Sequence, residues 1–219
     1  MRKILLVLIV VAAIVSIGWA CTTILVSKGA SVDGSVMTSH SCDCGACDFR
    51  YVYVPAADYE PGAQRAVYPF LEGYPRYVGK DMGPTYDDPN YPPTEPLGYI
   101  DQVEHTYAYY DGAYGIINEH QLAIGECTCS AKVYAQAKVG ECIFDVSALS
   151  KVALERCTTA REAIELMGAL AVEYGYYGWG ETLTVADTEE AWVFEICATP
   201  DQKSALWAAK KVPDGEVFV

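Results

Sequence analysis

The distribution of proline restricts this chain more than any other feature of its sequence. Nine of the eleven prolines lie in one tyrosine-rich stretch between Pro55 and Gly98. Proline lacks a backbone N–H and has a fixed φ, so this stretch cannot form a regular helix or a central strand. We predict that it is a long loop packed over the domain rather than a disordered linker.

Regular secondary structure is predicted on both sides of this stretch. Alternating and β-branched residues predict strands at 22–27, 35–39, 51–54, 106–110, 121–125, 182–186, 191–196 and 205–212. Asp33-Gly34 predicts a hairpin turn after the first strand, and residues 187–190 predict a tight turn between two of the later ones.

Two successive helices are predicted between these groups of strands. The first has apolar residues at positions 148, 149, 152 and 153, which form a helical stripe. The second begins with a capping box, Thr159 and Glu162, and ends at Gly175. Strands, a helix pair and further strands predict an α+β fold with the helices layered on an antiparallel sheet.

Size and charge restrict the functional class. The chain has 219 residues, enough for one domain, and is 52% hydrophobic, too apolar for a disordered tail. It carries 29 acidic and 15 basic side chains, for a net charge of −14. This charge disfavours binding to nucleic acid or to an anionic membrane surface.

The N-terminus has the features of a signal peptide. Two basic residues precede an unbroken apolar run, Ile4–Val15, and Gly18 and Ala20 form a small-x-small cleavage site. We predict that residues 1–20 are removed on export and that a secreted mature chain begins at Cys21, without stable membrane insertion. The alternatives are a retained membrane anchor and a lipidated Cys21, although the residues before Cys21 fit a lipoprotein signal poorly.

Eight cysteines remain when Cys21 is set aside. They are Cys42, Cys44, Cys47, Cys127, Cys129, Cys142, Cys157 and Cys197. In an oxidising compartment we expect most of them to form disulfides, and we predict no metal and no cofactor. The alternative is a zinc site built from Cys42, Cys44 and Cys47 with the Cys127 pair, although the spacing lacks the usual C-x2-C knuckles.

A cysteine that becomes the first residue can combine two catalytic roles. Its thiol is a nucleophile, and its α-amine, with a pKa of about 7.7–8.0, can accept the thiol proton near neutral pH. The alternative is that Cys21 merely follows the cleavage site and enters a disulfide.

Several segments resemble the C69 dipeptidases, which are N-terminal-nucleophile hydrolases. The resemblance rests on residues 21–26 (CTTILV), 33–35 (DGS), 39–43 (SHSCD), 114–126 (YGIINEHQLAIGE), 183–187 (LTVAD) and 190–195 (EAWVFE). It covers nearly the whole of residues 21–219 and implies an αββα sandwich that hydrolyses small peptides. Where the family usually has G-E-T-T, this chain has Cys127 in place of the first threonine.

The resemblance also implies roles for three residues. Cys21 is expected to be the nucleophile, and Asp43 to orient its amine and thiol. Asn118 is expected to donate a side-chain N–H to the oxyanion of the tetrahedral intermediate. The alternatives are a solvated loop carboxylate for Asp43 and a β-turn residue for Asn118.

Family sequences continue beyond the position of Val219 to a second oxyanion residue. We therefore expect residues 21–219 to be the N-terminal portion of the sandwich, incomplete at its C-terminal side. Two other functions are compatible with the sequence. One is an amidase that acts on non-peptide amides by the same mechanism, and the other is a catalytically inactive, disulfide-rich exported binding domain.

Overall fold

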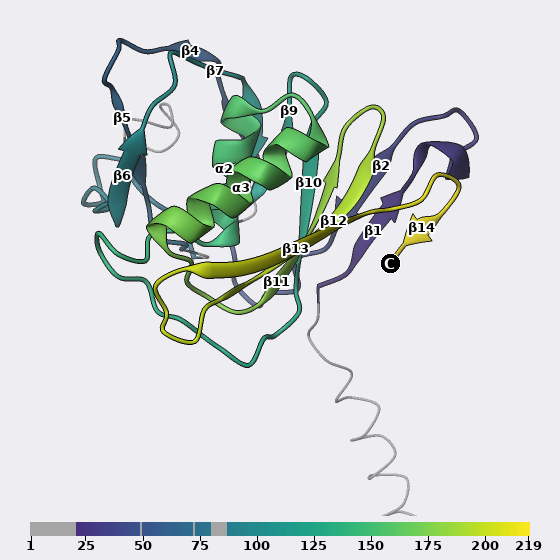
Figure 1. Cartoon of the computed structure of the whole chain (residues 1–219). Helices are drawn as coiled ribbons and strands as arrows, with labels where there is room; N and C mark the ends of the chain where they lie inside the picture. Colours follow the sequence, from purple (N-terminus) through teal and green to yellow (C-terminus); the bar gives the residue numbers. More distant parts are fainter. Residues whose placement is uncertain (1–20, 49, 72, 80–86) are drawn as a thin grey trace, which may run out of the picture.

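The computed structural model describes residues 21–48, 50–71, 73–79 and 87–219, so the predicted signal peptide lies outside the described residues. A large antiparallel sheet with strand order β13-β12-β11-β10-β9-β8-β3 forms its centre (Figure 1). Its strands are β3 (Val52–Val54), β8 (Tyr109–Asp111), β9 (Gly115–Asn118), β10 (Ala123–Thr128), β11 (Glu181–Ala186), β12 (Ala191–Ala198) and β13 (Ala205–Lys211). No helix among the described residues is long and apolar enough to cross a bilayer.

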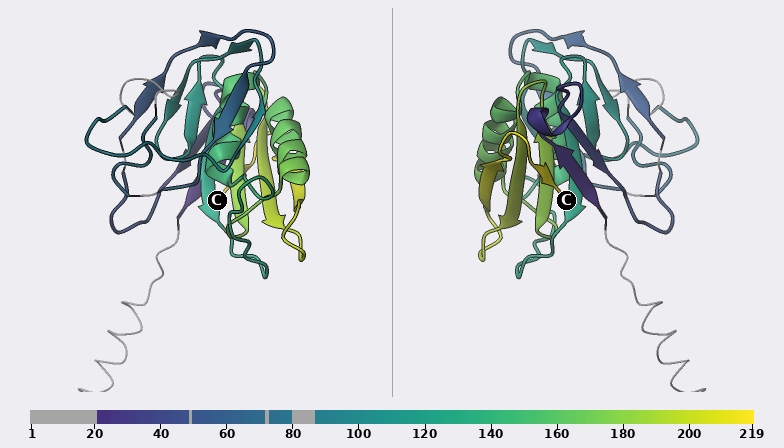
Figure 2. Two further views of the ribbon diagram at one scale, coloured as in Figure 1. Left: turned by 90° about the vertical axis from the view of Figure 1, so that its left-hand side faces the viewer. Right: turned by 90° about the vertical axis from the view of Figure 1, so that its right-hand side faces the viewer.

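A smaller antiparallel sheet and two helices cover opposite faces of the large sheet (Figure 2). The small sheet has the order β14-β1-β2, with β1 (Thr23–Val26), β2 (Met37–His40) and β14 (Val217–Phe218). A short 3-10 helix, η1 (Lys28–Ala30), follows β1. The resulting α+β architecture agrees with the sequence prediction.

Strand β11 shows how the layers are held together. All six of its residues are buried, because each face of the strand is covered. Leu183 belongs to the core beneath the helices, whereas the neighbouring Ala186 belongs to the core beneath β1. Thr184 also faces the small sheet, since its Oγ1 lies 2.6 Å from Thr38 Oγ1 of β2. Successive side chains of a strand point to opposite faces, so a strand that is buried along its whole length lies in the middle layer.

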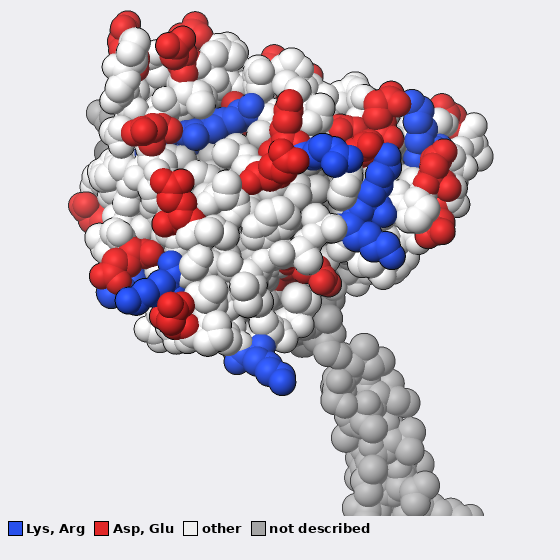
Figure 3. All heavy atoms as spheres, in the orientation of Figure 1, with Lys and Arg blue, Asp and Glu red and all other residues white. Residues whose placement is uncertain are grey.

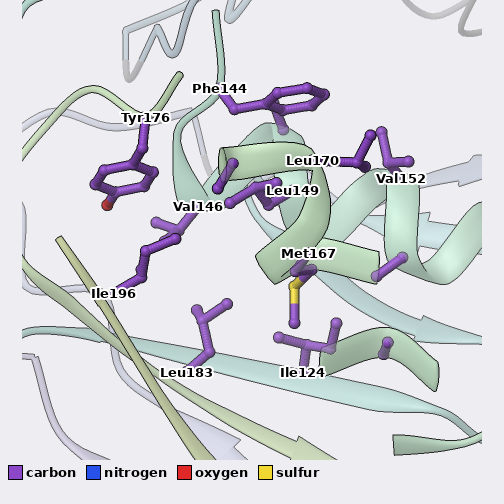
Figure 4. Close-up of a cluster of buried hydrophobic side chains, with 14 of the residues drawn as sticks. Ile124, Phe144, Val146, Leu149, Val152, Met167, Leu170, Tyr176, Leu183 and Ile196 are labelled. Atoms are coloured by element: carbon purple, nitrogen blue, oxygen red, sulfur yellow. The ribbon is translucent and has the colours of Figure 1, made fainter. Parts of the chain in front are cut away.

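The helices are α2 (Val146–Arg156) and α3 (Ala160–Tyr174), close to the prediction of a first helix over 147–156 and a second between Thr159 and Gly175. The capping box of Thr159 and Glu162 forms as predicted, and Gly175 ends α3 with a φ of 80°, which suits glycine. Figure 4 shows the core between the helices and the sheet, where Met167 of α3 and Leu149 of α2 lie near Ile124 of β10 and Leu183 of β11.

The proline-rich stretch packs over the domain, as predicted, and contacts α2. Short strands outside the central sheet, which were not predicted, also form in and beside this stretch. These strands are β4 (Ala57–Asp58), which pairs with β7 (His105–Thr106), and β5 (Gln64–Val67), which pairs with β6 (Gly98–Asp101). The buried Arg65 guanidinium binds both carboxylate oxygens of Glu155 in α2, at 3.0 and 2.7 Å. Val67 and Ile100 enter the main core.

Strand β9 was not predicted, since no strand or helix is predicted over residues 112–120. Gly115 has a packing role: a Cβ there would lie 2.8 Å from Leu154 Cδ1 of α2, so glycine allows the helix to approach the strand. The next strand begins and ends later than predicted, at Ala123 and Thr128 instead of 121 and 125.

The surface in Figure 3 shows basic and acidic side chains interspersed on the face that carries the helices. The basic groups on that face form no continuous positive patch. Several are paired with acids, for example Lys211 with Glu190 at 2.7 Å.

Candidate active site

The β1–β2 hairpin places Cys21 beside the segment that follows β2. Thr23 is paired with His40 in this hairpin. Beyond that pair, Ser41 N donates to Thr22 O at 2.9 Å, and Thr22 N donates to Ser41 Oγ at 3.1 Å. The strand pairing therefore continues to the level of the half-buried Cys21.

Asp43 lies at the Cys21 thiol. The backbone N–H of Asp43 donates to the Cys21 sulfur, an interaction that stabilises the thiolate and lowers the thiol pKa. The Asp43 carboxylate has the opposite effect, because its negative charge raises the same pKa. The structure thus brings together two of the three residues singled out in the sequence.

Strands β10 and β11 supply the other neighbours of Cys21. The Cys127 thiol donates to the Cys21 carbonyl oxygen at 3.0 Å. Burial is the largest cause that raises the pKa of the Cys21 thiol, and the carboxylates of Glu126, Asp43 and Glu181 raise it further. The net shift is upward, so the thiol is protonated at neutral pH and needs a base before it can attack.

Glu126 and Glu181 form a buried carboxyl pair on these two strands. The pKa of Glu181 is raised to about 9, mainly by burial and further by a hydrogen bond to Glu126 and repulsion from it. The pair therefore holds a proton at neutral pH. Sequence reasoning included Glu126 only as part of the family pattern and missed Glu181, whose position at the start of a strand gives no local signal.

Asn118 lies at the end of β9 and makes a different set of contacts from those expected. Its side-chain N–H groups donate to the carbonyl oxygens of Leu154 and Cys157, at 2.9 and 2.8 Å, at the C-terminal end of α2. Its Oδ1 accepts from the backbone N–H groups of His120 and Leu122. A side-chain amide has only two N–H bonds, so none remains for an oxyanion in this structure. Asn118 fastens α2 to β9 and is not placed with Cys21.

The two sheets approach each other closely at Gly125 of β10. A Cβ at this position would lie 2.6 Å from Thr184 Oγ1, 3.1 Å from Thr38 Oγ1 and 3.3 Å from His40 Nδ1. Glycine therefore permits β2, and with it the loop that carries Asp43, to lie against the large sheet. Burial lowers the pKa of His40, which keeps the imidazole neutral at neutral pH.

A cleft of about 620 Å³ opens between β2 and the strands β9 and β10. Thr38, His40 and Cys42 line one side, and Tyr51 and Ile116 are among the residues of the other. Cys42 follows Ser41, which is hydrogen-bonded to Thr22, so this end of the cleft lies near Cys21. The volume is within the range of sites for small ligands.

One disulfide forms among the described residues, between Cys44 and Cys47. The Cys42 sulfur lies within 4.8 Å of both of these sulfurs, whereas Cys127 and Cys129 lie outside this cluster. Cys142 and Cys157 are buried thiols. The expectation that most of the eight cysteines pair is therefore wrong for this structure, because only Cys44 and Cys47 are bonded to each other and the other six form no disulfide.

Comparison with known proteins agrees with the resemblance found in the sequence. The pattern that defines peptidase family C69 matches residues 20–219, and the chain belongs to this family. It is 28% identical over 204 residues to a protein of Latilactobacillus sakei described as "Probable dipeptidase". That match covers 89% of this chain and 37% of the other protein, so the chain spans little more than a third of the length of this relative.

Proposed function

We propose that residues 21–219 form the N-terminal portion of an N-terminal-nucleophile hydrolase domain in a secreted cysteine dipeptidase. The observation that carries this proposal is the position of Cys21. It follows the predicted cleavage site directly, it is half-buried near one end of the cleft, and the Asp43 N–H points at its sulfur. Membership of a peptidase family and the dipeptidase-named relative support the reaction class.

The proposed reaction is amide hydrolysis through a thioester. The Cys21 sulfur bonds to the substrate carbonyl carbon while the thiol proton passes to the Cys21 α-amine. The C–N bond then breaks, and the α-ammonium gives the proton to the departing amine. Water attacks the thioester, again with proton transfer through the α-amine, and releases the carboxylic acid and the thiol.

The raised pKa of the Cys21 thiol means that the thiol needs a nearby group to accept its proton. The thiol pKa is raised by burial and three carboxylates, so little thiolate forms spontaneously. An α-ammonium at Cys21 is a positive charge within two bonds of the thiol-bearing carbon, and it favours the thiolate. We propose that Asp43 holds this ammonium and orients it toward the sulfur.

Removal of the nucleophile tests the proposal. Secreted protein is sequenced from its N-terminus and assayed on a panel of dipeptides as wild type, Cys21→Ala, Cys21→Ser and Cys129→Ala, the last a control at an exposed cysteine. We expect a start at Cys21, loss of turnover in Cys21→Ala, and a reduction of about 100-fold or more in Cys21→Ser because a hydroxyl is a poorer nucleophile. A start at another residue, or full activity of Cys21→Ala, would refute the mechanism.

A further inference from the structure

We propose that Cys127 is the partner of Cys21 in a reversible disulfide, so that peroxide joins the two thiols instead of oxidising the nucleophile irreversibly. Formation of the bond depends only on the two side chains, whereas its effect on hydrolysis rests on the proposed function. Cys127 stands where the family pattern usually has threonine. The second sulfur at this position is therefore a departure of this chain from the pattern.

The packing of the two sheets turns both side chains toward the same interface. Leu25 of β1 is buried together with Ala186 of β11, so it faces the large sheet, and Cys21 lies four residues before it. Residues two or four apart in an extended segment share a face. On β10, Gly125 faces the small sheet, and Cys127 follows it by two residues. The two cysteines therefore face each other from adjacent layers.

A direct contact limits the distance between the two residues. The Cys127 Sγ donates to the Cys21 carbonyl oxygen at 3.0 Å. That oxygen is about 2.4 Å from the Cys21 Cα by standard bond lengths, so the Cys127 sulfur lies within about 5.4 Å of this Cα. In a disulfide the partner sulfur is about 4 Å from the same Cα. Rotation of the Cys21 side chain and a shift of about 1.5 Å therefore bring the two sulfurs to bonding distance.

Cys21 has the freedom that this shift requires. In the proposed mature chain it is the first residue, so a single peptide bond restrains it. That bond joins it to Thr22, which is held in place by hydrogen bonds with Ser41. Cys21 and Cys127 are both partly exposed, so a small peroxide can reach them.

The proposed oxidation has two balanced steps. The Cys21 sulfur attacks one oxygen of hydrogen peroxide, the O–O bond breaks, and a sulfenic acid and water form. The Cys127 sulfur then attacks the Cys21 sulfur, the S–O bond breaks, and a second water leaves. Hydrogen peroxide thus takes up the two electrons and two protons that the thiols lose. A dithiol reductant reverses the reaction by two exchange steps and is itself oxidised to a disulfide.

The neighbouring thiol determines the fate of the sulfenic acid. Without a thiol partner, peroxide oxidises it further to a sulfinic acid, which thiol reductants do not restore. Cys127 competes with this second oxidation because it is already positioned beside Cys21. Burial raises the pKa of both thiols, so the reactive thiolates are minor forms at neutral pH. The experiment therefore uses an excess of peroxide.

The test identifies the partner of Cys21 directly. Wild type, Cys127→Ser, Cys42→Ser and the exposed control Cys129→Ser are reduced, desalted, treated with hydrogen peroxide, alkylated and digested without reductant. Serine retains a donor for the Cys21 carbonyl and removes the sulfur. By mass spectrometry we expect a peptide that links Cys21 to Cys127 in all proteins except Cys127→Ser. In that variant we expect sulfinic acid at Cys21 instead.

The Cys42 variant addresses the competing partner. Cys42 follows Ser41, the residue that is hydrogen-bonded to Thr22, and its sulfur lies within 4.8 Å of those of Cys44 and Cys47. A link from Cys21 to Cys42 in wild type overturns the inference. Equal amounts of sulfinic acid at Cys21 in wild type and Cys127→Ser, or a wild-type protein that forms no link, also overturn it.

Dipeptide turnover is the second measurement, and each protein is compared with its own rate before oxidation. We expect wild type to lose turnover with peroxide and to recover most of it with dithiothreitol, whereas the loss in Cys127→Ser is permanent. A link from Cys21 to Cys127 with full turnover supports the disulfide and refutes Cys21 as the nucleophile. If wild type has no turnover before oxidation, the proposed function fails, and the linked peptide alone decides the inference.

Discussion

The close approach of the two sheets at Gly125 predicts how a substitution at this position affects stability and activity. An alanine there places its Cβ 2.6 Å from Thr184 Oγ1 and 3.1 Å from Thr38 Oγ1. Real Cβ atoms do not tolerate the first distance, and the two hydroxyls are themselves 2.6 Å apart, so neither can move aside independently. Thr184 is the cross-strand partner of Gly125 in the large sheet and Thr38 belongs to the small sheet, so we expect both the Thr184 side chain and the small sheet to shift.

The expected cost of Gly125→Ala follows from overpacking. One extra carbon in a tightly packed interior costs about 1–3 kcal/mol of unfolding free energy. For a chain of this length, that cost corresponds to a fall in Tm of about 2–12 °C. Strand β2 leads directly into the loop of Asp43, so a shift of β2 displaces the Asp43 N–H from the Cys21 sulfur. We therefore expect the rate of hydrolysis to fall by a larger factor than the loss of stability alone would cause.

Thermal unfolding and kinetics of four variants test this reasoning. Thr184→Ala removes the nearest atom, so the double variant with Gly125→Ala should recover part of the lost stability, with a coupling of about 0.5–3 kcal/mol. Gly73→Ala is the control, because a Cβ at Gly73 meets no atom of the described residues within 4 Å. A Gly125→Ala protein with unchanged Tm and activity, or a strictly additive double variant, would refute the close-approach argument.

Three further predictions concern the interior of the domain. Asn118→Ala should lower the unfolding free energy by about 2–4 kcal/mol in denaturant titration, because it leaves the Leu154 and Cys157 carbonyls without donors. The control Asn90→Ala, in an exposed turn, should have little effect on the unfolding free energy. The pKa of Glu181 is about 9 in the folded protein and near 4.5 when unfolded, so the native state binds the extra proton and stability should fall as the pH rises from about 4.5 to about 9. Glu181→Gln should flatten this pH dependence, and an unchanged slope would contradict the shift. Burial raises the pKa of the Cys157 thiol to about 12, so iodoacetamide should label it only after unfolding, and rapid labelling of native protein detected by mass spectrometry would contradict the structure.

Local sequence patterns were sufficient to predict the elements that are stabilised by contacts between residues close in sequence. The capping box at Thr159 and Glu162 closes within four residues, and the apolar stripes of both helices repeat within two turns. The capping box and the helices were predicted because their cause and their effect lie in the same stretch of chain. The proximity of Cys21 to Asp43 was implied by the family resemblance, and in the structure one hairpin that joins the two segments produces it.

The remaining features depend on partners that are distant in the sequence. Asn118 was expected to serve catalysis, but the carbonyl groups that bind it lie 36 and 39 residues away on a helix. No local signal indicated the role of Gly115 or Gly125, because each allows a close contact with a residue that is distant in the chain. The pairing of Glu126 with Glu181 depends on the register of two strands separated in sequence by the whole helix pair. The sequence determined both helices, most strands of the large sheet and, through the family resemblance, the candidate nucleophile. Only the tertiary structure decided which polar groups meet in the interior, because burial and charge there depend on how the layers pack.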